Sequence, residues 1–544
     1  MREFKTSIKG GKKWVTAGIL GLAAVFFIVI ISTAYAGDEG SKKIIKFGEA
    51  GNFFIQKGLD PHTALGGGSI MIIQSLFEGL ARKEVGTGTI KPCLATSWKI
   101  APDWSHADFT IRKGIKFHNG DPLTAEDVKF SFERAMREDL GFVFRGEMTR
   151  SIDNVKVMGP YQVRIKLKEP WPAILDRCAM SIAIVPKAYI TKVGDQKFAE
   201  NPVGTGPFKI ISFKADDYVN MAAVKDHWRQ APNYDEFRLM SIKEAATRFS
   251  MLKTGELDVT WTGPAYIGAV AKDPTLKNIV APHCYLHTIV FYDLIDRNDP
   301  KSPKYKSPWQ DPRVRQAASL AINREGICKL MPGLISPWGN FLAPYHPGYQ
   351  KREIPRYDPE AAKKLLCEVA GVKYPVKAPY PWESWDWGDL TWGPPVRLGF
   401  EPLMTQLWEV GIKVKAAETE DGIWMKKHTG GELRGIGYGP GPFWAGYSHP
   451  AASFESHTIG TWAPVGRTYP EFKKAYEKMV NAPNNKALAQ AAREMEDLMF
   501  KVGYRTPLWE VNNIFALGPK VEWFQTVPGS NYLFGFEYLK YKTK

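Results

Sequence analysis

Aromatic side chains are concentrated in and just after a glycine- and proline-rich segment, residues 435–446. Tyr438, Phe443, Trp444 and Tyr447 lie there within a short stretch. Flat aromatic faces stack on sugars, planar solutes and cations, and Tyr and Trp add a polar group for hydrogen bonding. Long ordered loops in compact proteins are often functional. The segment therefore predicts the binding of a small molecule, with packing of these rings onto their own domain as the alternative.

Metal ligands and catalytic groups show no comparable pattern. His283 and His287 are four residues apart, but the surrounding run 278–294 is typical of a β-strand. Four residues along a strand span about 13 Å, too far for two ligands of one ion. The G-x-S-x-G, H-E-x-x-H, Walker A and G-x-G-x-x-G motifs are absent from the sequence. We therefore expect no metal, no cofactor and no catalytic residue.

The N-terminal 36 residues have the composition of an export signal. Basic residues precede the uncharged apolar stretch Trp14–Ile31, and the small-residue sequence Ala34–Ala36 follows it. This order is typical of a secretory signal with an A-x-A cleavage site. The apolar stretch is longer than the usual ~7–15 residues, so an uncleaved membrane anchor is the alternative. We expect a periplasmic protein, with residues 1–36 either removed or retained as an anchor.

The composition is that of an ordinary globular protein of 544 residues, with 44% hydrophobic and 24% charged side chains. The formal net charge is +15, of which residues 1–36 contribute +4. The remaining charge is scattered without a basic run, so no nucleic-acid partner is expected. The five cysteines are far apart and odd in number. Most of them are predicted to be buried free thiols.

Amphipathic patterns and cap signals predict the helices that support these loops. Thr124 and Asp127 resemble a capping box. Asp311-Pro312 and Asp358-Pro359 each combine an N-cap with a first-turn proline. Helical spacing of apolar residues predicts helices through 124–136, 312–322, 359–369, 472–479 and 488–499.

Strand-like runs are mixed with these helices. The alternating apolar residues between Ala107 and Gly120 predict a β-hairpin that turns at Gly114. No repeat of ~20–50 residues is present. The sequence therefore predicts an α/β protein.

Several phrases, all in the same order along the chain, resemble those of one protein family. The longest begins with Leu94-Ala95-Thr96-Ser97-Trp98 and continues through Phe109–Gly120 to Pro122–Val128. The others are Leu59-Asp60-Pro61, Leu76-Phe77-Glu78-Gly79-Leu80, Asn201–Phe208, Asp311–Ala317 and Tyr357-Asp358-Pro359. With these phrases the chain resembles the bacterial extracellular solute-binding proteins of the peptide, nickel and opine group, which serve ABC importers.

The resemblance implies a two-lobed periplasmic-binding-protein fold of type II, in the large variant with an extra subdomain inserted in lobe I. A two-stranded hinge is expected between the lobes. Lobe I is expected from residues 42–72, 201–288 and 511–544, the inserted subdomain from 73–200, and lobe II from 289–510. The resemblance also implies that the lobes close around a solute and that ABC permease subunits in the cytoplasmic membrane recognise the closed form. We expect a monomer that is not an enzyme.

One position departs from the peptide-binding members of this family. Those members hold the peptide's α-ammonium with an aspartate in a phrase resembling Trp-x-Ala-Asp-Tyr-x-x-Pro, because a buried cation needs a paired carboxylate. The matching segment here is Phe443–Pro450, where Gly446 replaces that aspartate, and no acidic residue occurs between Arg434 and Pro450. The sequence thus favours an oligosaccharide, an aromatic-compatible solute or a modified peptide. A nickel chelate or an opine is the alternative ligand, and an exported enzyme is the alternative function.

Carrying the family geometry over places the ligand between one early segment and one late segment. The predicted ligand-binding residues are Phe53, Phe54 and Gln56 in lobe I and Tyr438, Phe443, Trp444, Gly446 and Tyr447 in lobe II. Among these, Trp444 and Tyr447 are expected to contribute most from lobe II.

Overall fold

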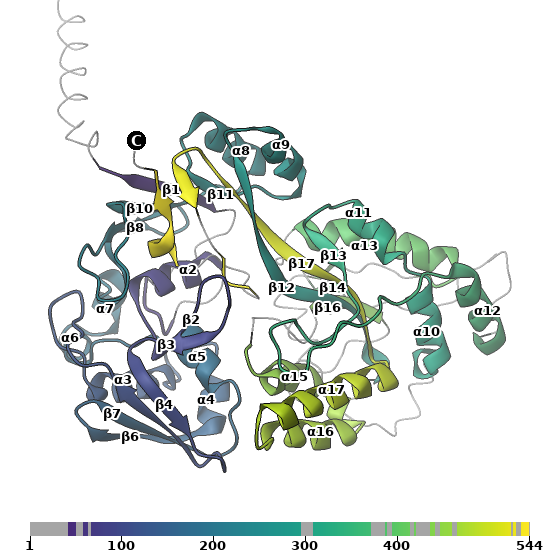
Figure 1. Cartoon of the computed structure of the whole chain (residues 1–544), viewed down its shortest axis with the longest axis horizontal. Helices are drawn as coiled ribbons and strands as arrows, with labels where there is room; N and C mark the ends of the chain where they lie inside the picture. Colours follow the sequence, from purple (N-terminus) through teal and green to yellow (C-terminus); the bar gives the residue numbers. More distant parts are fainter. Residues whose placement is uncertain are drawn as a thin grey trace, which may run out of the picture.

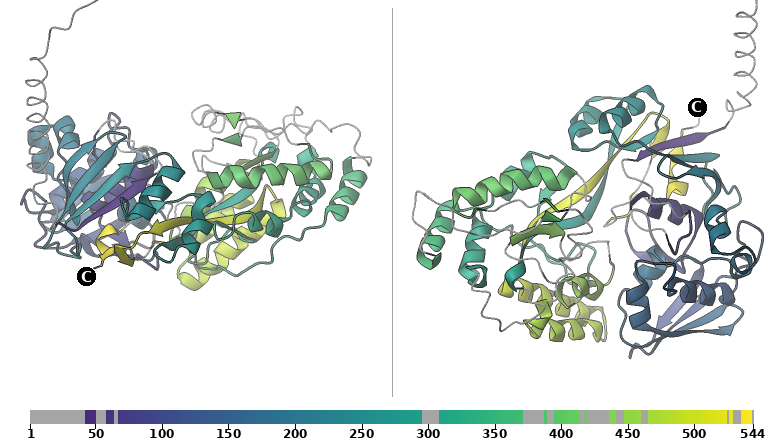
Figure 2. Two further views of the ribbon diagram at one scale, coloured as in Figure 1. Left: turned by 90° about the horizontal axis from the view of Figure 1, so that it is seen from above. Right: turned by 180° about the vertical axis from the view of Figure 1, so that it is seen from behind.

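The structure is a computed structural model of the whole chain. It describes residues 42–49, 58–63, 67–294, 308–370, 387–388, 394–413, 418–419, 436–440, 447–459, 465–523, 526–528 and 535–542. Two lobes lie side by side and are joined by a pair of long strands (Figures 1 and 2). The predicted α/β class and the two-lobed arrangement are confirmed.

A mixed nine-stranded sheet extends through both lobes. Its order is β16-β12-β17-β11-β1-β10-β9-β8, and β13 also pairs with β17. The strands are β1 (Ile44–Glu49), β8 (Phe208–Lys214), β9 (Tyr218–Ala223), β10 (Glu236–Ser241), β11 (Val259–Trp261), β12 (Lys277–Phe291), β13 (Ile335–Pro337), β16 (Ile436–Pro440) and β17 (Arg505–Leu517). Within this sheet β1 is parallel to β10 and β11, whereas the other pairs are antiparallel.

Strands β12 and β17 are shared by the two lobes. Residues 277–281 of β12 pair with 513–517 of β17, next to β11 of lobe I. After a register shift between Ala281 and Tyr285, β12 continues beside β16 while β17 continues beside β13, both in lobe II. His283 within this shift has a positive φ of 56°. The expected two-stranded hinge is therefore the pair of β12 and β17. The predicted boundaries between lobe I and lobe II, at 288/289 and 510/511, fall inside these two strands.

A separate four-stranded sheet, in the order β4-β5-β7-β6, forms a subdomain of lobe I. Its strands are β4 (Ala95–Ile100), β5 (His106–Ile111), β6 (Ile152–Gly159) and β7 (Gln162–Leu167), and its helices are α3 (Ala125–Ala135), α4 (Arg145–Ser151) and α5 (Ile174–Met180). It has its own hydrophobic core. The hairpin of β2 (Ala81–Lys83) and β3 (Ile90–Pro92) precedes it. All of these elements lie within residues 73–200, whose limits stay a prediction.

The β-hairpin predicted between Ala107 and Gly120 is wrong. Strand β5 pairs with β4 and β7, and Lys116 makes only an isolated bridge to Pro122. Both halves of the segment nevertheless bury their apolar side chains in the subdomain core. The alternation therefore reflects burial on one face and not pairing of the two halves.

The predicted helices are confirmed, together with several of their caps. Thr124 and Asp127 form a capping box at the start of α3, and the Asp311 side chain accepts a hydrogen bond from the Arg313 amide. Lobe I also contains α2 (Gly67–Leu76), α6 (Lys187–Val193), α7 (Asp195–Glu200), α8 (Ala245–Thr254) and α9 (Ile267–Lys272). Lobe II contains α10 (Pro312–Leu320), α11 (Arg324–Lys329), α12 (Pro359–Ala370), α13 (Pro394–Glu409), α15 (Pro450–Thr458), α16 (Glu471–Val480) and α17 (Asn485–Val502).

Short elements complete the described part of the chain. They are the strands β14 (Trp387–Gly388), β15 (Glu418–Thr419), β18 (Val521–Trp523) and β19 (Lys540–Tyr541), and the 3₁₀ helices η1 (Pro264–Tyr266), η2 (Tyr292–Leu294), η3 (Pro308–Gln310), η6 (Val465–Arg467) and η7 (Phe536–Tyr538). All five cysteines are free thiols. Cys93, Cys178, Cys284 and Cys328 are buried and Cys367 is exposed, as predicted for most of them.

Buried histidines give the stability of the fold a pH dependence. Burial lowers the pKa of His62 to about 4 and that of His287 to about 3. In the unfolded chain these side chains bind protons below about pH 6.5. Protonation therefore favours the unfolded chain only below that pH. The free energy of unfolding is highest above about pH 6.5 and decreases as the pH falls from about 6.5 toward 4.

We expect His287→Gln to lose stability less steeply than the wild type on acidification. The variant takes up one proton fewer on unfolding. The slope of its free energy of unfolding against pH should therefore be smaller than that of the wild type by about 1.4 kcal/mol per pH unit between about pH 6 and 4. Denaturant titrations at a series of pH values measure this slope. Identical slopes for the two proteins would contradict a neutral, buried His287.

Candidate functional site

The predicted site residues are only partly within the described chain. Those outside it are Phe53, Phe54, Gln56, Phe443, Trp444 and Gly446. Their ligand roles stay predictions. Tyr438 and Tyr447 are described. Tyr438 lies in the core of lobe II, whereas Tyr447 lies where the two lobes meet.

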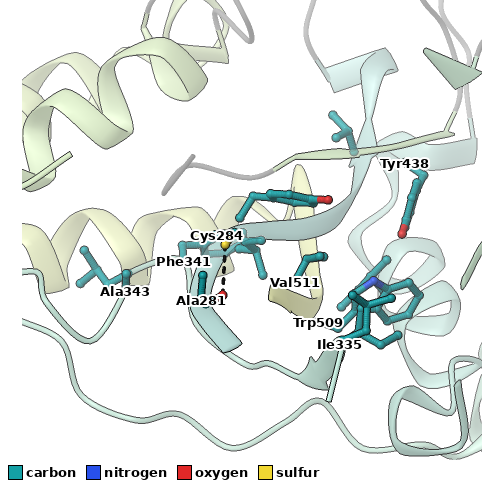
Figure 3. Packing of buried hydrophobic residues seen from close by; sticks show 14 of the residues in the cluster. Ala281, Cys284, Ile335, Phe341, Ala343, Tyr438, Trp509 and Val511 are labelled. Atoms are coloured by element: carbon teal, nitrogen blue, oxygen red, sulfur yellow. Dashed lines mark hydrogen bonds between the residues drawn. The ribbon is translucent and has the colours of Figure 1, made fainter. Parts of the chain in front are cut away.

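Tyr438 lies on β16 inside the core of lobe II and is only 7% exposed. Its hydroxyl is hydrogen-bonded to His287 Nδ1, and the two ring centres are 4.6 Å apart in an edge-on arrangement. Trp509 lies on β17, the strand on the far side of β12, and its ring centre is 5.9 Å from that of Tyr438. Figure 3 shows Tyr438 and Trp509 in the hydrophobic cluster that also holds Cys284 of β12. These contacts favour the packing alternative for Tyr438, and a ligand contact stays a prediction.

Tyr447 lies just before α15 of lobe II but contacts lobe I. Its ring packs against the core of the inserted subdomain, and its hydroxyl accepts a hydrogen bond from Arg177 of α5. The Arg177 guanidinium also lies 3.6 Å from the ring centre of Phe144 and donates to Glu147 at 2.7 Å. Tyr447 is therefore at the contact between the lobes, where the ligand site was predicted.

The electrostatics of this contact keep its charges paired. Burial opposes ionisation of Glu147, but the Arg177 guanidinium lowers the pKa of that carboxyl below its ordinary value. Burial raises the pKa of Tyr447 to about 12, so the phenol stays neutral. Arg177 and Glu147 thus form a charged pair within lobe I, onto which Tyr447 closes.

Asp176, the residue before Arg177, makes a second contact between the lobes. Its carboxylate accepts hydrogen bonds from the Ser448 amide at 3.0 and 3.1 Å and from the Ser448 hydroxyl at 3.1 Å. Lys83 Nζ of strand β2 lies 3.1 Å from the same carboxylate. The Asp176 and Lys83 side chains are only 3% and 5% exposed. Segment 447–449 of lobe II therefore rests on a buried ion pair of lobe I.

Further contacts extend along this boundary. Arg150 of α4 pairs with Glu455 of α15 at 2.7 Å, and the Trp104 indole donates to the Val480 carbonyl of α16 at 3.1 Å. Ala452 of α15 is buried in the core of the inserted subdomain. In this structure the lobes are closed against each other.

Two neutral histidines support segment 447–449 from within lobe II. His346 Nδ1 accepts from the Ala343 amide at 3.1 Å, and its Nε2 donates to the Tyr447 carbonyl at 2.7 Å. The His449 ring accepts from the Ala451 amide at the start of α15. Burial lowers the pKa of both imidazoles to about 4. They are therefore uncharged at neutral pH.

A cavity of about 50 Å³ lies within lobe I next to the Lys83 side chain. It is bounded by β2, by the end of α5 and by the C-terminal segment, and its lining includes Gln74, Glu78, Arg82, Lys83, Ala179, Met180, Arg229 and Glu537. Arg229 bonds Glu78 at 3.1 Å and Glu537 at 2.7 Å. The cavity is thus polar, and the Lys83 side chain that lines it also pairs with Asp176.

Metal chemistry finds no support among the described residues. No group of three or more His, Cys, Asp or Glu is placed there to hold an ion. His283 and His287 both lie on β12, which agrees with the strand predicted over residues 278–294. His283 is hydrogen-bonded to Glu510 and His287 to Tyr438.

The family model for bacterial extracellular solute-binding proteins, family 5 Middle, matches residues 89–461. The chain belongs to this family. Among curated relatives, di/tripeptide-binding protein 2 of Pseudomonas aeruginosa is 28% identical over 417 residues, which are 71% of this chain and 73% of that protein. This relative is named as a binding protein and not as an enzyme.

Solved structures confirm the predicted type II fold of this family. The ABC transporter-associated periplasmic binding protein DppA from Helicobacter pylori, in complex with the peptide STSA, has a TM-score of 0.73 and 22% identity, covering 93% of this chain and 99% of its own. NikA from Brucella suis, in complex with Fe(III)-EDTA, has a TM-score of 0.76 and 19% identity, covering 92% and 100%. At these identities the likeness concerns the fold.

Membrane association was an open question at the N-terminus. No helix among the residues that the structure describes is both long and apolar enough to cross a bilayer. The predicted signal or anchor in residues 1–36 lies outside that part of the chain.

Sequence reasoning missed the lobe I side of this contact. Lys83, Glu147, Asp176 and Arg177 come from β2, α4 and α5, which are far apart in the sequence. The one available signal was the charged pair Asp176-Arg177 within the otherwise apolar run 171–185. Charges inside such a run need partners, because an isolated buried charge is strongly unfavourable. The partners themselves follow only from the tertiary fold.

We expect Tyr447→Phe to weaken closure of the lobes without unfolding either one. The variant loses one hydrogen bond to a charged group, worth roughly 1.5 kcal/mol or more, while the Arg177–Glu147 pair remains. Retention of a co-purified solute during dialysis should fall about tenfold. Tyr189→Phe is the control, because that hydroxyl bonds the Asn201 carbonyl within lobe I. Equal retention by both variants would exclude a role for Tyr447 in closure.

Proposed function

We propose that this protein captures a small solute between its lobes and delivers it to the permease of an ABC importer. The observation that carries the proposal is the contact of Tyr447 and Ser448 with Arg177 and Asp176. Tyr447 is the last of the predicted ligand-binding residues and Ser448 follows it, so closure over a solute and closure onto lobe I involve the same segment. Membership of the solute-binding family supports the same role.

The proposed solute has no free ammonium group. Gly446 replaces the aspartate that peptide-binding members use. The carboxylates of Asp176 and Glu147, which lie at segment 447–449, already have cationic partners inside lobe I. A ligand ammonium buried there would find no unpaired carboxylate among the described side chains that contact this segment.

The ligand classes that remain are an oligosaccharide, another neutral or aromatic-compatible solute, or a modified peptide. The relatives bind diverse ligands, since DppA from Helicobacter pylori holds a peptide and NikA from Brucella suis holds Fe(III)-EDTA. A nickel chelate or an opine is therefore the alternative for this chain. Aromatic stacking by Trp444 is the proposed lobe II contact for any of these ligands.

The location and behaviour of the protein follow from this role. We propose export to the periplasm through residues 1–36, action as a monomer, and binding without turnover. The ABC permease would then recognise the closed form, in which the two lobes present one continuous surface.

Native mass spectrometry of freshly purified protein tests the proposal. We expect one small molecule per chain, unchanged on prolonged incubation and unreactive toward primary-amine reagents. Trp444→Ala should retain it at least about tenfold less, because a desolvated stacking contact contributes ~1–3 kcal/mol. Trp408→Ala is the control, since Trp408 on α13 is 48% exposed.

Two results would contradict the proposal in different ways. Chemical turnover of the bound molecule would rule out a pure binding protein. Recovery of a mixture of unmodified peptides would leave the binding role intact but refute the proposed ligand class.

A further inference from the structure

The Asp176 carboxylate is buried where the lobes meet, yet it belongs to neither a helix cap nor a hydrophobic core. It lies on α5 and receives the Ser448 amide and hydroxyl from lobe II. Ser448 is two residues from Gly446, the position of the missing aspartate. The Asp176 carboxylate of lobe I therefore contacts a residue that is two positions along the chain from the one where peptide-binding members carry their aspartate.

Lys83 supplies the cation that this carboxylate needs. Its Nζ lies 3.1 Å from Asp176 Oδ1, and both side chains are almost completely buried. Removing one partner of such a pair leaves an uncompensated buried charge, which is strongly destabilising. The neighbouring guanidinium of Arg177 is engaged with Glu147, Phe144 and Tyr447. Lys83 is thus the lobe I cation that pairs with Asp176.

The cavity in lobe I offers space for a small ammonium ion to take the place of Lys83 Nζ when the Lys83 side chain is shortened. Lys83 lines the cavity, as do Ala179 and Met180 from the turn of α5 that follows Asp176. Truncation of the Lys83 side chain would extend the cavity toward the carboxylate. A small primary ammonium ion could then donate to Asp176 in place of Lys83 Nζ.

We propose that Lys83 is a specificity-determining residue whose ammonium occupies the position at Asp176 that a solute's ammonium would otherwise take. The inference rests on the proposed function, because it concerns the same solute site. It assigns the exclusion of free-amine solutes to an internal ion pair and not only to the absence of an aspartate at Gly446.

Chemical rescue of Lys83→Ala tests the ion pair without knowledge of the natural ligand. Loss of the cation should lower the melting temperature by about 5 °C or more. Propylammonium chloride should restore at least half of that loss, whereas tetramethylammonium chloride, which cannot donate a hydrogen bond, should not. If Lys83→Ala is unfolded without added salt, refolding in the two salts gives the same comparison.

Matched variants separate this effect from general effects of salt or charge. Lys91→Ala removes a half-exposed lysine from the adjacent strand β3, where its partner Glu84 is 3.7 Å away. It should respond equally to both salts. The double variant Lys83→Ala with Asp176→Asn has no buried charge at this position and should lose the specific response to propylammonium. A propylammonium response that persists in the double variant would overturn the proposal.

Specificity is measured with the dipeptide Ala-Phe and its N-acetyl derivative by calorimetry on ligand-stripped protein. We expect the wild type to discriminate against the free amine, and Lys83→Ala to bind Ala-Phe at least about tenfold more tightly than the wild type does. N-acetyl-Ala-Phe should gain no such affinity. Equal affinities of the two proteins for Ala-Phe would overturn the specificity role.

The outcomes distinguish this inference from the proposed function. A retained solute without turnover, combined with no amine-dependent gain in Lys83→Ala, would refute only the role of Lys83. Turnover of the solute would refute the binding function, while the ammonium rescue would still test the Lys83–Asp176 pair.

Discussion

Both lobes depend on one pair of hydrogen-bonded strands. Because β12 and β17 contribute to the sheets of lobe I and lobe II, the register shift between Ala281 and Tyr285 sets how the lobes face each other. A small change of backbone torsion there moves α15 and α16 relative to α4 and α5, since the rest of each lobe is a packed unit. The site is therefore completed by the hinge and not by either lobe alone.

The lobe contact is built from charges that are neutralised before the lobes meet. Lys83 pairs with Asp176 and Arg177 with Glu147, all within lobe I. Lobe II contributes mainly neutral donors and rings, namely the Ser448 amide and hydroxyl, the Tyr447 phenol and two uncharged histidines. Closure thus buries few unpaired charges, which keeps its electrostatic cost low. The Arg150–Glu455 pair is an exception at the more exposed edge.

Local sequence signals predicted the elements better than their assembly. The capping box at Thr124 and the Asp-Pro starts at 311 and 358 gave correct helices, because caps act within a few residues. The hairpin between Ala107 and Gly120 was wrong, since alternation reports burial and not the pairing partner. A phrase in the sequence predicts a ligand role for the lobe II segment around Tyr447, and the structure places Tyr447 at the contact between the lobes. The partners of this segment on β2, α4 and α5 could not be predicted, because only tertiary contacts bring them together.

Small-angle X-ray scattering is the most direct test of the central claim that the lobes close over a solute about the β12–β17 hinge. The radius of gyration would be compared between freshly purified protein and the same protein after partial unfolding, dialysis and refolding to remove the solute. The account predicts a larger radius for the stripped protein and a return to the smaller value when the recovered solute is added back. An unchanged radius in all three states would contradict it.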